Sequence, residues 1–316
     1  MGSAVVPEPK LPILNFSEQT QKPGTNSWVL ACKDVRRALE EYGCFIVLYD
    51  KITCQLNNAI FGALEDLFDL PTQTKMKNVY HDKPLKGYVG QIPKLPLHES
   101  MGIDNATTLE GTKTFTNIMW PTGNDHFSKC AYSFAKIAEE LDQMVTRMIF
   151  ESYGLHDKYY ESFAASITYL LRPLKNKAPK VDEPTLGFVT HTDKSFTTIL
   201  YQNQIDGLEV ELKNGDWLKV ELPPLSFVFM AGDALMAWSN DRIVSPSHRV
   251  VVSGKQDRYS LAQFSFGNGM VQVPQELVDD EHPLKYKSFD HLGLLLFFGT
   301  DEGYKSKCPI KAYCGV

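Results

Sequence analysis

The stretch LEVELKNGDWLKVEL, residues 208–222, decides the fold class of this chain. Apolar side chains alternate with polar ones before and after Asn214-Gly215. Alternation with a period of two is typical of a β-strand with one buried face, and Asn-Gly between two such runs is typical of a tight hairpin turn. The stretch therefore predicts two antiparallel strands joined by a hairpin.

The same pattern continues through the second half of the chain. Apolar or alternating runs occur at residues 226–230, 249–252 and 259–266, and turn-forming residues separate them. A series of short strands of this kind is typical of a β-sandwich or a β-barrel. We therefore expect a β core over about residues 165–270.

The first half of the chain is predicted to be mostly helical, because its apolar residues recur at the spacing of amphipathic helices. The fold class is therefore α+β. We expect one compact unit, with a mixed α/β region at 1–120 and with helices, the β core and a C-terminal helix in 121–316. The predicted elements outside the core are helices at 26–42, 55–68, 127–153 and 289–298, a buried strand at 44–48 and a long loop at 83–111.

The composition excludes several classes of protein. The chain has 316 residues, 43% of them hydrophobic, which is enough for a large buried core. Its net charge is −6, and no block of Lys or Arg supplies the basic face that a nucleic-acid partner requires. The longest apolar stretch near the C-terminus, residues 292–298, is too short to span a membrane.

Cysteine usage and the N-terminus favour a cytoplasmic protein. None of the six cysteines forms a Cys-x-x-Cys pair, and residues 1–10 contain no apolar segment typical of a signal peptide. We therefore expect reduced thiols. A monomer is the expected oligomeric state, and a small molecule is the expected partner, rather than a nucleic acid or a membrane.

Two histidines and one aspartate of the β half form a candidate metal site. In the extended segment His191-Thr192-Asp193 the first and third side chains point to the same face. His248 follows after enough chain for several strands, which could return it to the same place. Two His and one carboxylate are the ligand set of non-haem Fe(II) oxygenases, which leaves three coordination positions open.

A candidate carboxylate-binding pair follows ten residues after His248. Alternation places Arg258 and Ser260 on one face of a strand. A guanidinium and a hydroxyl side by side can bind a carboxylate through charge-assisted hydrogen bonds. A metal site beside such a pair predicts a dicarboxylate co-substrate that chelates the metal at its other end.

These motifs together resemble the plant Fe(II)- and 2-oxoglutarate-dependent dioxygenases. The shared features are His-x-Asp, a distal His in Ser-x-x-His-Arg-Val and Arg-x-Ser ten residues later. The resemblance extends over nearly the whole chain, and two segments are most similar to the specialised-metabolism branch of the family. The supporting segments are residues 11–16, 41–45 and 232–242, and the two branch-specific segments are residues 115–121 and 236–240.

The resemblance implies a fold, a set of cofactors and an activity. The core is expected to be a double-stranded β-helix, or jelly roll, with the helical half packed on it. Fe(II) would be held by His191, Asp193 and His248, and the far carboxylate of 2-oxoglutarate by Arg258 and Ser260. O₂ would be the oxidant, ascorbate the reductant, and succinate and CO₂ the co-products. The presence of Asp193 favours hydroxylation, because halogenating members of the family lack this carboxylate; demethylation, desaturation and ring closure remain possible.

One part of the sequence departs from the family pattern. The family usually has Asn-Tyr-Tyr-Pro before the core, and one Tyr there helps to hold 2-oxoglutarate. The stretch that we align with it reads Thr168-Tyr169-Leu170-Leu171. Tyr169 is thus the candidate replacement for the missing contact.

The substrate is expected to be a small plant specialised metabolite. Its candidate contacts are His98, Asn117, Trp120, Phe188, Phe264 and Phe266. Three alternatives stay open: an Fe(II) oxidase that needs no 2-oxoglutarate, an enzyme that oxidises auxin or gibberellin, and a non-catalytic small-molecule binding protein on the same fold.

Overall fold

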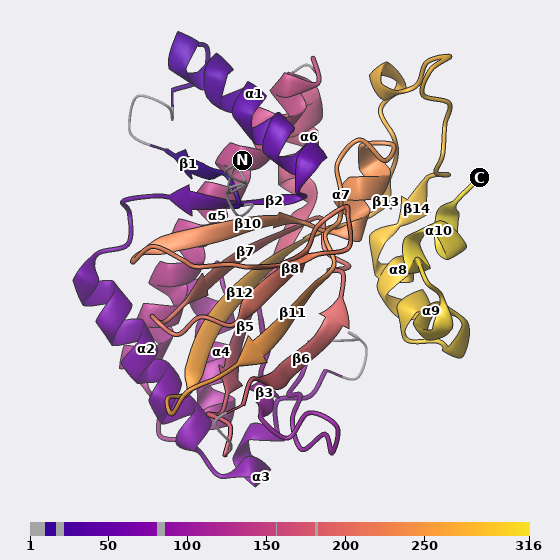
Figure 1. Ribbon diagram of the computed structural model, residues 1–316. Coiled ribbons are helices and arrows are strands. Elements are labelled where there is room, and N and C mark those ends of the chain that lie inside the picture. Colours follow the sequence, from indigo (N-terminus) through magenta and orange to yellow (C-terminus); the bar gives the residue numbers. More distant parts are fainter. Residues whose placement is uncertain (1–9, 17–21, 81–85, 156, 181–182) are drawn as a thin grey trace, which may run out of the picture.

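The fold is that of a computed structural model, which describes residues 10–16, 22–80, 86–155, 157–180 and 183–316 (Figure 1). Two sheets that face each other form its centre, and helices cover the outer side of the larger one. The fold class is thus α+β, as predicted. None of the helices in these ranges combines the length and the apolar character that crossing a membrane requires.

The larger sheet contains strands from both halves of the chain. Its order is β1-β2-β10-β7-β12-β5-β3, with β4 also paired to β5, and all of these pairs are antiparallel except β1 with β2. The strands are β1 (Ile13–Asn15), β2 (Cys44–Leu48), β3 (His98–Ser100), β4 (Ile103–Asp104), β5 (Ile167–Asn176), β7 (Thr197–Gln202), β10 (Ser226–Ala231) and β12 (Arg258–Gly267).

The smaller sheet has the order β6-β11-β8-β9 and is antiparallel throughout its described strands. They are β6 (Thr185–His191), β8 (Leu208–Glu211), β9 (Trp217–Lys219) and β11 (His248–Val252). In β8 and β9, Val210 pairs with Leu218, so the predicted hairpin around Asn214-Gly215 is confirmed. A separate short ribbon joins β13 (Met270–Val271) to β14 (Phe289–Asp290).

The predicted helices are present, and each has a recognisable start. Thr25, Thr53 and Asn124 each accept a hydrogen bond from a backbone N–H of the first helical turn, which stabilises the helix end. The helices are α1 (Asn26–Glu41), α2 (Cys54–Asp69), α3 (Thr72–Lys75), α4 (Leu109–Met119), α5 (Asp125–Ser152), α6 (Asp157–Ser166), α7 (Asp233–Trp238), α8 (His291–Phe298), α9 (Asp301–Lys305) and α10 (Pro309–Cys314), with a 3₁₀ turn at Gln275–Leu277.

The prediction of a long loop at 83–111 is wrong in part. The strands β3 and β4 and the beginning of α4 lie within it. The two strands have only three and two residues, so they are too short to show a periodicity, and their pairing with β5 stabilises them. The predicted C-terminal helix begins two residues late, at His291, because Phe289–Asp290 forms a strand.

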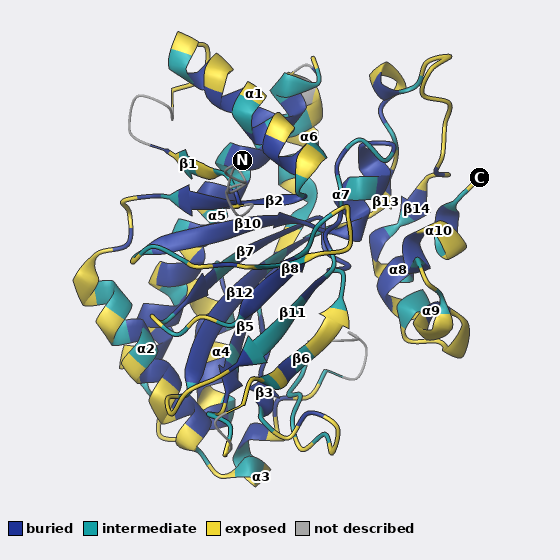
Figure 2. Ribbon diagram, in the orientation of Figure 1, coloured by how far each residue is buried: buried dark blue, intermediate teal, exposed yellow. Residues whose placement is uncertain are grey.

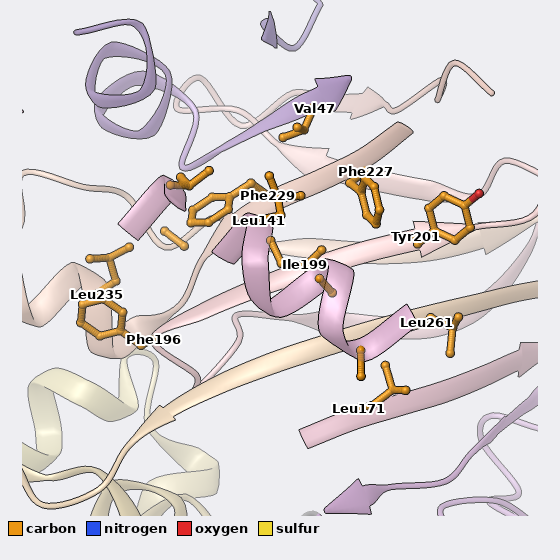
Figure 3. Close-up of a cluster of buried hydrophobic side chains, with 14 of the residues drawn as sticks. Val47, Leu141, Leu171, Phe196, Ile199, Tyr201, Phe227, Phe229, Leu235 and Leu261 are labelled. Atoms are coloured by element: carbon orange, nitrogen blue, oxygen red, sulfur yellow. The ribbon is translucent and has the colours of Figure 1, made fainter. Parts of the chain in front are cut away.

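The main hydrophobic core lies between α5 and the outer face of the larger sheet (Figure 3). Leu141 of α5 packs there in one cluster with Ile199 of β7, Phe229 of β10 and Leu261 of β12. Figure 2 shows the central strands buried and the outward faces of α1 and α2 exposed. Because successive side chains of a strand point to opposite faces, the alternate residues of β5, β7 and β12 face the space between the two sheets.

One glycine links the helical half to the smaller sheet. Gly43 ends α1 with a φ of +71°, which lies in the left-handed region that favours glycine. A Cβ at this position would lie 2.3 Å from the carbonyl oxygen of Val244. The close approach holds the segment that leads to β11, and thus to His248, against the end of α1.

Candidate active site

His191, Asp193 and His248 come together between the two sheets. His191 ends β6 and His248 begins β11, and the antiparallel register of these strands pairs the two residues directly. Their ring centroids are 4.2 Å apart. Oδ1 of Asp193 lies 3.6 Å from Nε2 of His191 and 3.8 Å from Nε2 of His248. One ligand atom from each of the three residues lies within 4.8 Å of the others, which is close enough for one metal ion to contact all three.

Backbone carbonyl groups orient both imidazoles. Nδ1 of His191 lies 2.8 Å from the carbonyl oxygen of Val189, and Nδ1 of His248 lies 3.2 Å from that of Pro246. A carbonyl can only accept, so each Nδ1 bears a proton, and this contact directs each Nε2 toward Asp193. Burial, and then the neighbouring His248, lower the pKa of His191 to about 4, which keeps this ring neutral at neutral pH.

Hydrogen bonds from neighbouring polar groups fix the position of Asp193. Its Oδ2 accepts a 2.7 Å hydrogen bond from the Thr198 hydroxyl, and its backbone carbonyl accepts a 2.8 Å bond from the N–H of Asp233. The Asp233 carboxylate in turn accepts bonds from Lys194 and from Ser245, 2.7 Å each. Since Ser245 precedes His248 on the same segment, Asp233 ties the two ligand-bearing segments together.

Arg258 lies at the other end of the space between the sheets. It is buried, and burial lowers its pKa to about 10, so it stays charged at neutral pH. Its guanidinium donates to Ser260 Oγ (3.1 Å), to Gln202 Oε1 (2.7 Å) and to Asn176 Oδ1 (3.4 Å). Among the ion pairs of the described residues none contains Arg258. The Asp206 carboxylate, which accepts a 2.9 Å hydrogen bond from Gln202, lies near enough to favour the charged form of Arg258. A buried guanidinium whose own hydrogen bonds go to neutral groups fits an incoming carboxylate.

The prediction for Tyr169 is wrong. This residue lies on the opposite face of β5, where its hydroxyl donates a 2.9 Å hydrogen bond to Asp142 of α5 in the hydrophobic core. Asn176 of the same strand lies beside Arg258 instead, since the register pairs these two residues. Tyr169 is therefore turned away from Arg258, and Asn176 is the residue of β5 that contacts it.

A cavity of about 320 Å³ joins the two sites. The side chains of His98, Phe188, Phe264 and Phe266, four of the six predicted substrate contacts, line it. The rings of His98 and Phe188 lie 4.5 Å apart, and those of Phe188 and His191 lie 4.9 Å apart. A row of three rings in contact, from His98 through Phe188 to His191, therefore leads from β3 to the candidate metal site.

The other two predicted contacts, Asn117 and Trp120, do not line this cavity. Asn117 is exposed on α4, and the Trp120 ring packs 5.0 Å from that of Phe127 on α5. Both residues belong to the layer of helices outside the larger sheet. Their segment was chosen by its resemblance to relatives, which carries no information about the direction of a side chain.

Several residues of the cavity wall were missed by the sequence analysis. They are Ser100 of β3, Arg172 and Asn176 of β5, Lys194, Thr198 of β7, and Leu295 and Phe298 of α8. Alternation along β5 could have found Arg172 and Asn176 once the strand was extended to residue 176. Ser100 and the α8 residues had no such signal, because only the tertiary structure brings them to the cavity.

The donor set suits the group that the sequence suggested. Two imidazoles and one carboxylate are typical ligands for Fe(II), and together they leave positions on the metal open. The buried Arg258 faces the same cavity and suits the far end of a dicarboxylate. The residues present therefore fit both Fe(II) and 2-oxoglutarate.

Two family matches cover most of the chain. Residues 166–267 match the 2OG-Fe(II) oxygenase superfamily, and residues 11–121 match the N-terminal region of non-haem dioxygenases in morphine synthesis. A similar protein is the probable 2-oxoglutarate-dependent dioxygenase AOP1.2 of Arabidopsis thaliana. It is 42% identical over 312 residues, which cover 96% of this chain and 95% of that protein.

Solved structures of similar fold include two dioxygenases for auxin oxidation. The rice enzyme is 26% identical with a TM-score of 0.81, and the match covers 96% of this chain and 100% of that one. The Arabidopsis thaliana enzyme, in a binary complex with 2-oxoglutarate, is also 26% identical, with a TM-score of 0.77. That match covers 86% of this chain and 99% of the other.

Proposed function

The chain belongs to the 2OG-Fe(II) oxygenase superfamily, and we propose that His191, Asp193 and His248 hold its Fe(II) while Arg258 and Ser260 hold the far carboxylate of its 2-oxoglutarate. The protein is an oxidoreductase that uses Fe(II), 2-oxoglutarate and O₂. Membership also confirms the expected double-stranded β-helix core. The named relatives favour this function over a co-substrate-free oxidase and over a non-catalytic binder.

One observation supports the proposed roles above all. The three candidate ligands converge within 4.8 Å at the wall of the same cavity that contains Arg258. In such a cavity a dicarboxylate can contact the metal at one end and the guanidinium at the other.

When bound, Fe(II) with 2-oxoglutarate supplies the oxidation of a substrate carbon by O₂, with release of succinate and CO₂. The chain supplies orientation. Val189 and Pro246 fix the imidazoles, Thr198 holds one oxygen of Asp193, and Arg258 positions the far carboxylate. Phe264 and Phe266 make the neighbouring wall apolar, which excludes water from the reacting carbon.

The proposed substrate is a small plant specialised metabolite, and hydroxylation is the favoured reaction. The cavity volume of about 320 Å³ is at the lower end of ligand pockets and must also contain 2-oxoglutarate, so it favours a small molecule. His98, Phe188, Phe264 and Phe266 are proposed contacts. The two similar structures named for auxin oxidation support hormone oxidation as a second candidate.

We further propose that the protein acts as a cytoplasmic monomer. All six cysteines are free thiols, which suits a reducing compartment. Light scattering of the purified protein tests the monomer directly.

The decisive experiment is an anaerobic titration of the apoprotein with Fe(II) and then 2-oxoglutarate. Chelation of the metal by the co-substrate gives a metal-to-ligand charge-transfer band. The band should appear with the wild type, vanish in His191→Ala, and require far more 2-oxoglutarate in Arg258→Ala. A band of normal intensity in His191→Ala would refute the proposed iron site.

A further inference from the structure

A chain of buried polar groups follows the cavity wall away from Arg258. Its first link is Asn176, whose Oδ1 accepts from Arg258 Nη1 at 3.4 Å. The amide Nδ2 donates to the carbonyl oxygen of Gly187 at 2.9 Å, and a carbonyl can only accept. This contact fixes which end of the Asn176 amide is oxygen and which is nitrogen.

The next link fixes the tautomer of His98. The same Nδ2 lies 3.4 Å from Nδ1 of His98, so Nδ1 accepts and does not bear the proton. Burial, and then the positive charges of Arg172 and other neighbours, lower the pKa of His98 to about 4, so the ring has a single proton at neutral pH. That proton is on Nε2, which lies 3.3 Å from the Ser100 hydroxyl.

Ser100 therefore accepts two hydrogen bonds. Nε2–H of His98 donates to its Oγ, and so does Nη1 of Arg172 at 3.0 Å. Both lone pairs of the hydroxyl are thus engaged, and its own proton is left to donate. Within the ranges that the structure describes, no acceptor contacts this proton, although Ser100 is only 2% exposed. Because Ser100 lines the cavity, its proton is available to a bound molecule.

The charged residues that line the cavity favour one kind of hydrogen-bond acceptor for the Ser100 proton. Of the described residues that line the cavity, four are basic (Lys86, Arg172, Lys194 and Arg258), and Asp193 is the acid. Lys86 forms an ion pair with Asp104, and Lys194 forms one with Asp233. Arg172 is buried, and its Nη1 donates to Ser100 Oγ at 3.0 Å and to the Gly87 carbonyl at 3.3 Å, so its positive charge lies beside the Ser100 hydroxyl. An anionic oxygen is favoured in such surroundings.

We propose that Ser100, with the charge of Arg172, forms a subsite that binds a carboxylate of the substrate. This inference rests on the proposed function and names the substrate class: a small carboxylic acid with an apolar body. The row of rings from His98 through Phe188 to His191 adjoins the subsite, so the body of the acid would extend along these rings toward the iron. The carbon that is oxidised would lie at the end remote from the carboxylate.

The test compares acids with their methyl esters, which keep the shape and lose the charge. The anaerobic protein with Fe(II) and 2-oxoglutarate is titrated with phenylacetate, indole-3-acetate and octanoate, and with each methyl ester. Binding is followed by the shift of the charge-transfer band and by calorimetry. We expect at least one acid to bind roughly tenfold or more tightly than its ester, since a hydrogen bond to a charged group contributes about 1.5–3 kcal/mol.

Two substitutions of Ser100 then test its role in the subsite. Ser100→Ala should remove most of the preference for the acid, because loss of the donor weakens binding of the charged carboxylate more than binding of the neutral ester carbonyl. Ser100→Thr, which keeps the hydroxyl, should retain the preference. Ser128→Ala is the matched control, because Ser128 is a buried serine on α5 that does not line the cavity.

The proposal is overturned if the esters bind as tightly as the acids, if Ser100→Ala keeps the wild-type ratio, or if none of the three acids binds. The charge-transfer band distinguishes a failure of the carboxylate subsite from a failure of the proposed iron and 2-oxoglutarate sites. A normal band without acid preference contradicts the subsite alone, whereas the lack of a band contradicts the proposed iron and 2-oxoglutarate sites.

Discussion

The hydroxyl of Thr198 donates a 2.7 Å hydrogen bond to Oδ2 of Asp193, while Oδ1 of the same carboxylate faces both imidazoles. The Ser195 hydroxyl lies 3.0 Å from that of Thr198 and supports it. One carboxylate oxygen is thus held by the protein and the other is directed at the candidate metal position. This arrangement favours a carboxylate that binds through one oxygen, which leaves more of the metal open to ligands.

Thr198→Val should therefore weaken metal binding. The variant is nearly isosteric but cannot donate, so the carboxylate can rotate and offer both oxygens. Loss of such a supporting group typically lowers metal affinity about 10–100-fold. Co(II) titration measures the affinity, and the intensity of the visible Co(II) bands reports the coordination number. Thr198→Ser should restore both values, and an unchanged Co(II) affinity in Thr198→Val would contradict the role given to the hydroxyl.

Asn176 should affect 2-oxoglutarate and not the metal. Asn176→Asp places a carboxylate oxygen at the position of the present amide oxygen, which lies 3.4 Å from Nη1 of Arg258. The new ion pair would compete with the co-substrate and repel it, so its affinity should fall roughly tenfold or more, and further than in Asn176→Ala. Titration of the charge-transfer band with 2-oxoglutarate measures this. Equal affinities in Asn176→Asp and the wild type would exclude binding beside Asn176.

Tyr169→Phe should alter stability without altering the cavity. The variant removes the donor to a buried oxygen of Asp142, which costs about 1–3 kcal/mol of the free energy of unfolding. Because the hydroxyl lies on the core side of β5, the affinity for 2-oxoglutarate should stay at the wild-type value. Urea unfolding measures the first quantity and the band titration the second. A lower affinity for 2-oxoglutarate without a loss of stability would restore Tyr169 as a co-substrate contact.

Asp142 should make the stability depend on pH. Burial, which the hydrogen bonds from Thr197 and Tyr169 only partly offset, raises the pKa of Asp142 to about 6. In the unfolded chain a carboxyl has a pKa of about 3.9. The folded state thus binds more protons between these two values. The destabilisation by Asp142 is absent below about pH 4, grows as the pH rises and is complete above about pH 6.

Asp142→Asn removes this titration. Its free energy of unfolding relative to the wild type should increase by about 1 kcal/mol from pH 5 to pH 7. Urea unfolding at several pH values in this range measures the free energy of unfolding of both proteins. Subtracting the wild-type value from that of the variant removes the contribution of all other titrating groups, because both proteins share them. If the difference stays constant across the range, Asp142 has an ordinary pKa.

Much of the fold follows from local patterns. The alternation in 208–222 and the Asn-Gly turn gave the hairpin of β8 and β9, and the helical spacing gave α1, α2 and α5. The patterns failed where an element is very short, as for β3 and β4, whose pairing with β5 stabilises them. The pairing of β5 with β12 was also not predicted, so Asn176, which this pairing places beside Arg258, was missed.

The sequence by itself determined which residue types are present and which face of a strand they share. This was enough for the His-x-Asp pair, for Arg258 with Ser260, and for the family. Only the tertiary structure decided which strands pair and in which register. It sets His248 opposite His191, leaves Asn117 exposed on α4, packs Trp120 against Phe127, and brings Ser100 beside Arg172. The physical reason is that side-chain alternation is a local property of the backbone, whereas pairing depends on contacts between segments that are distant in sequence.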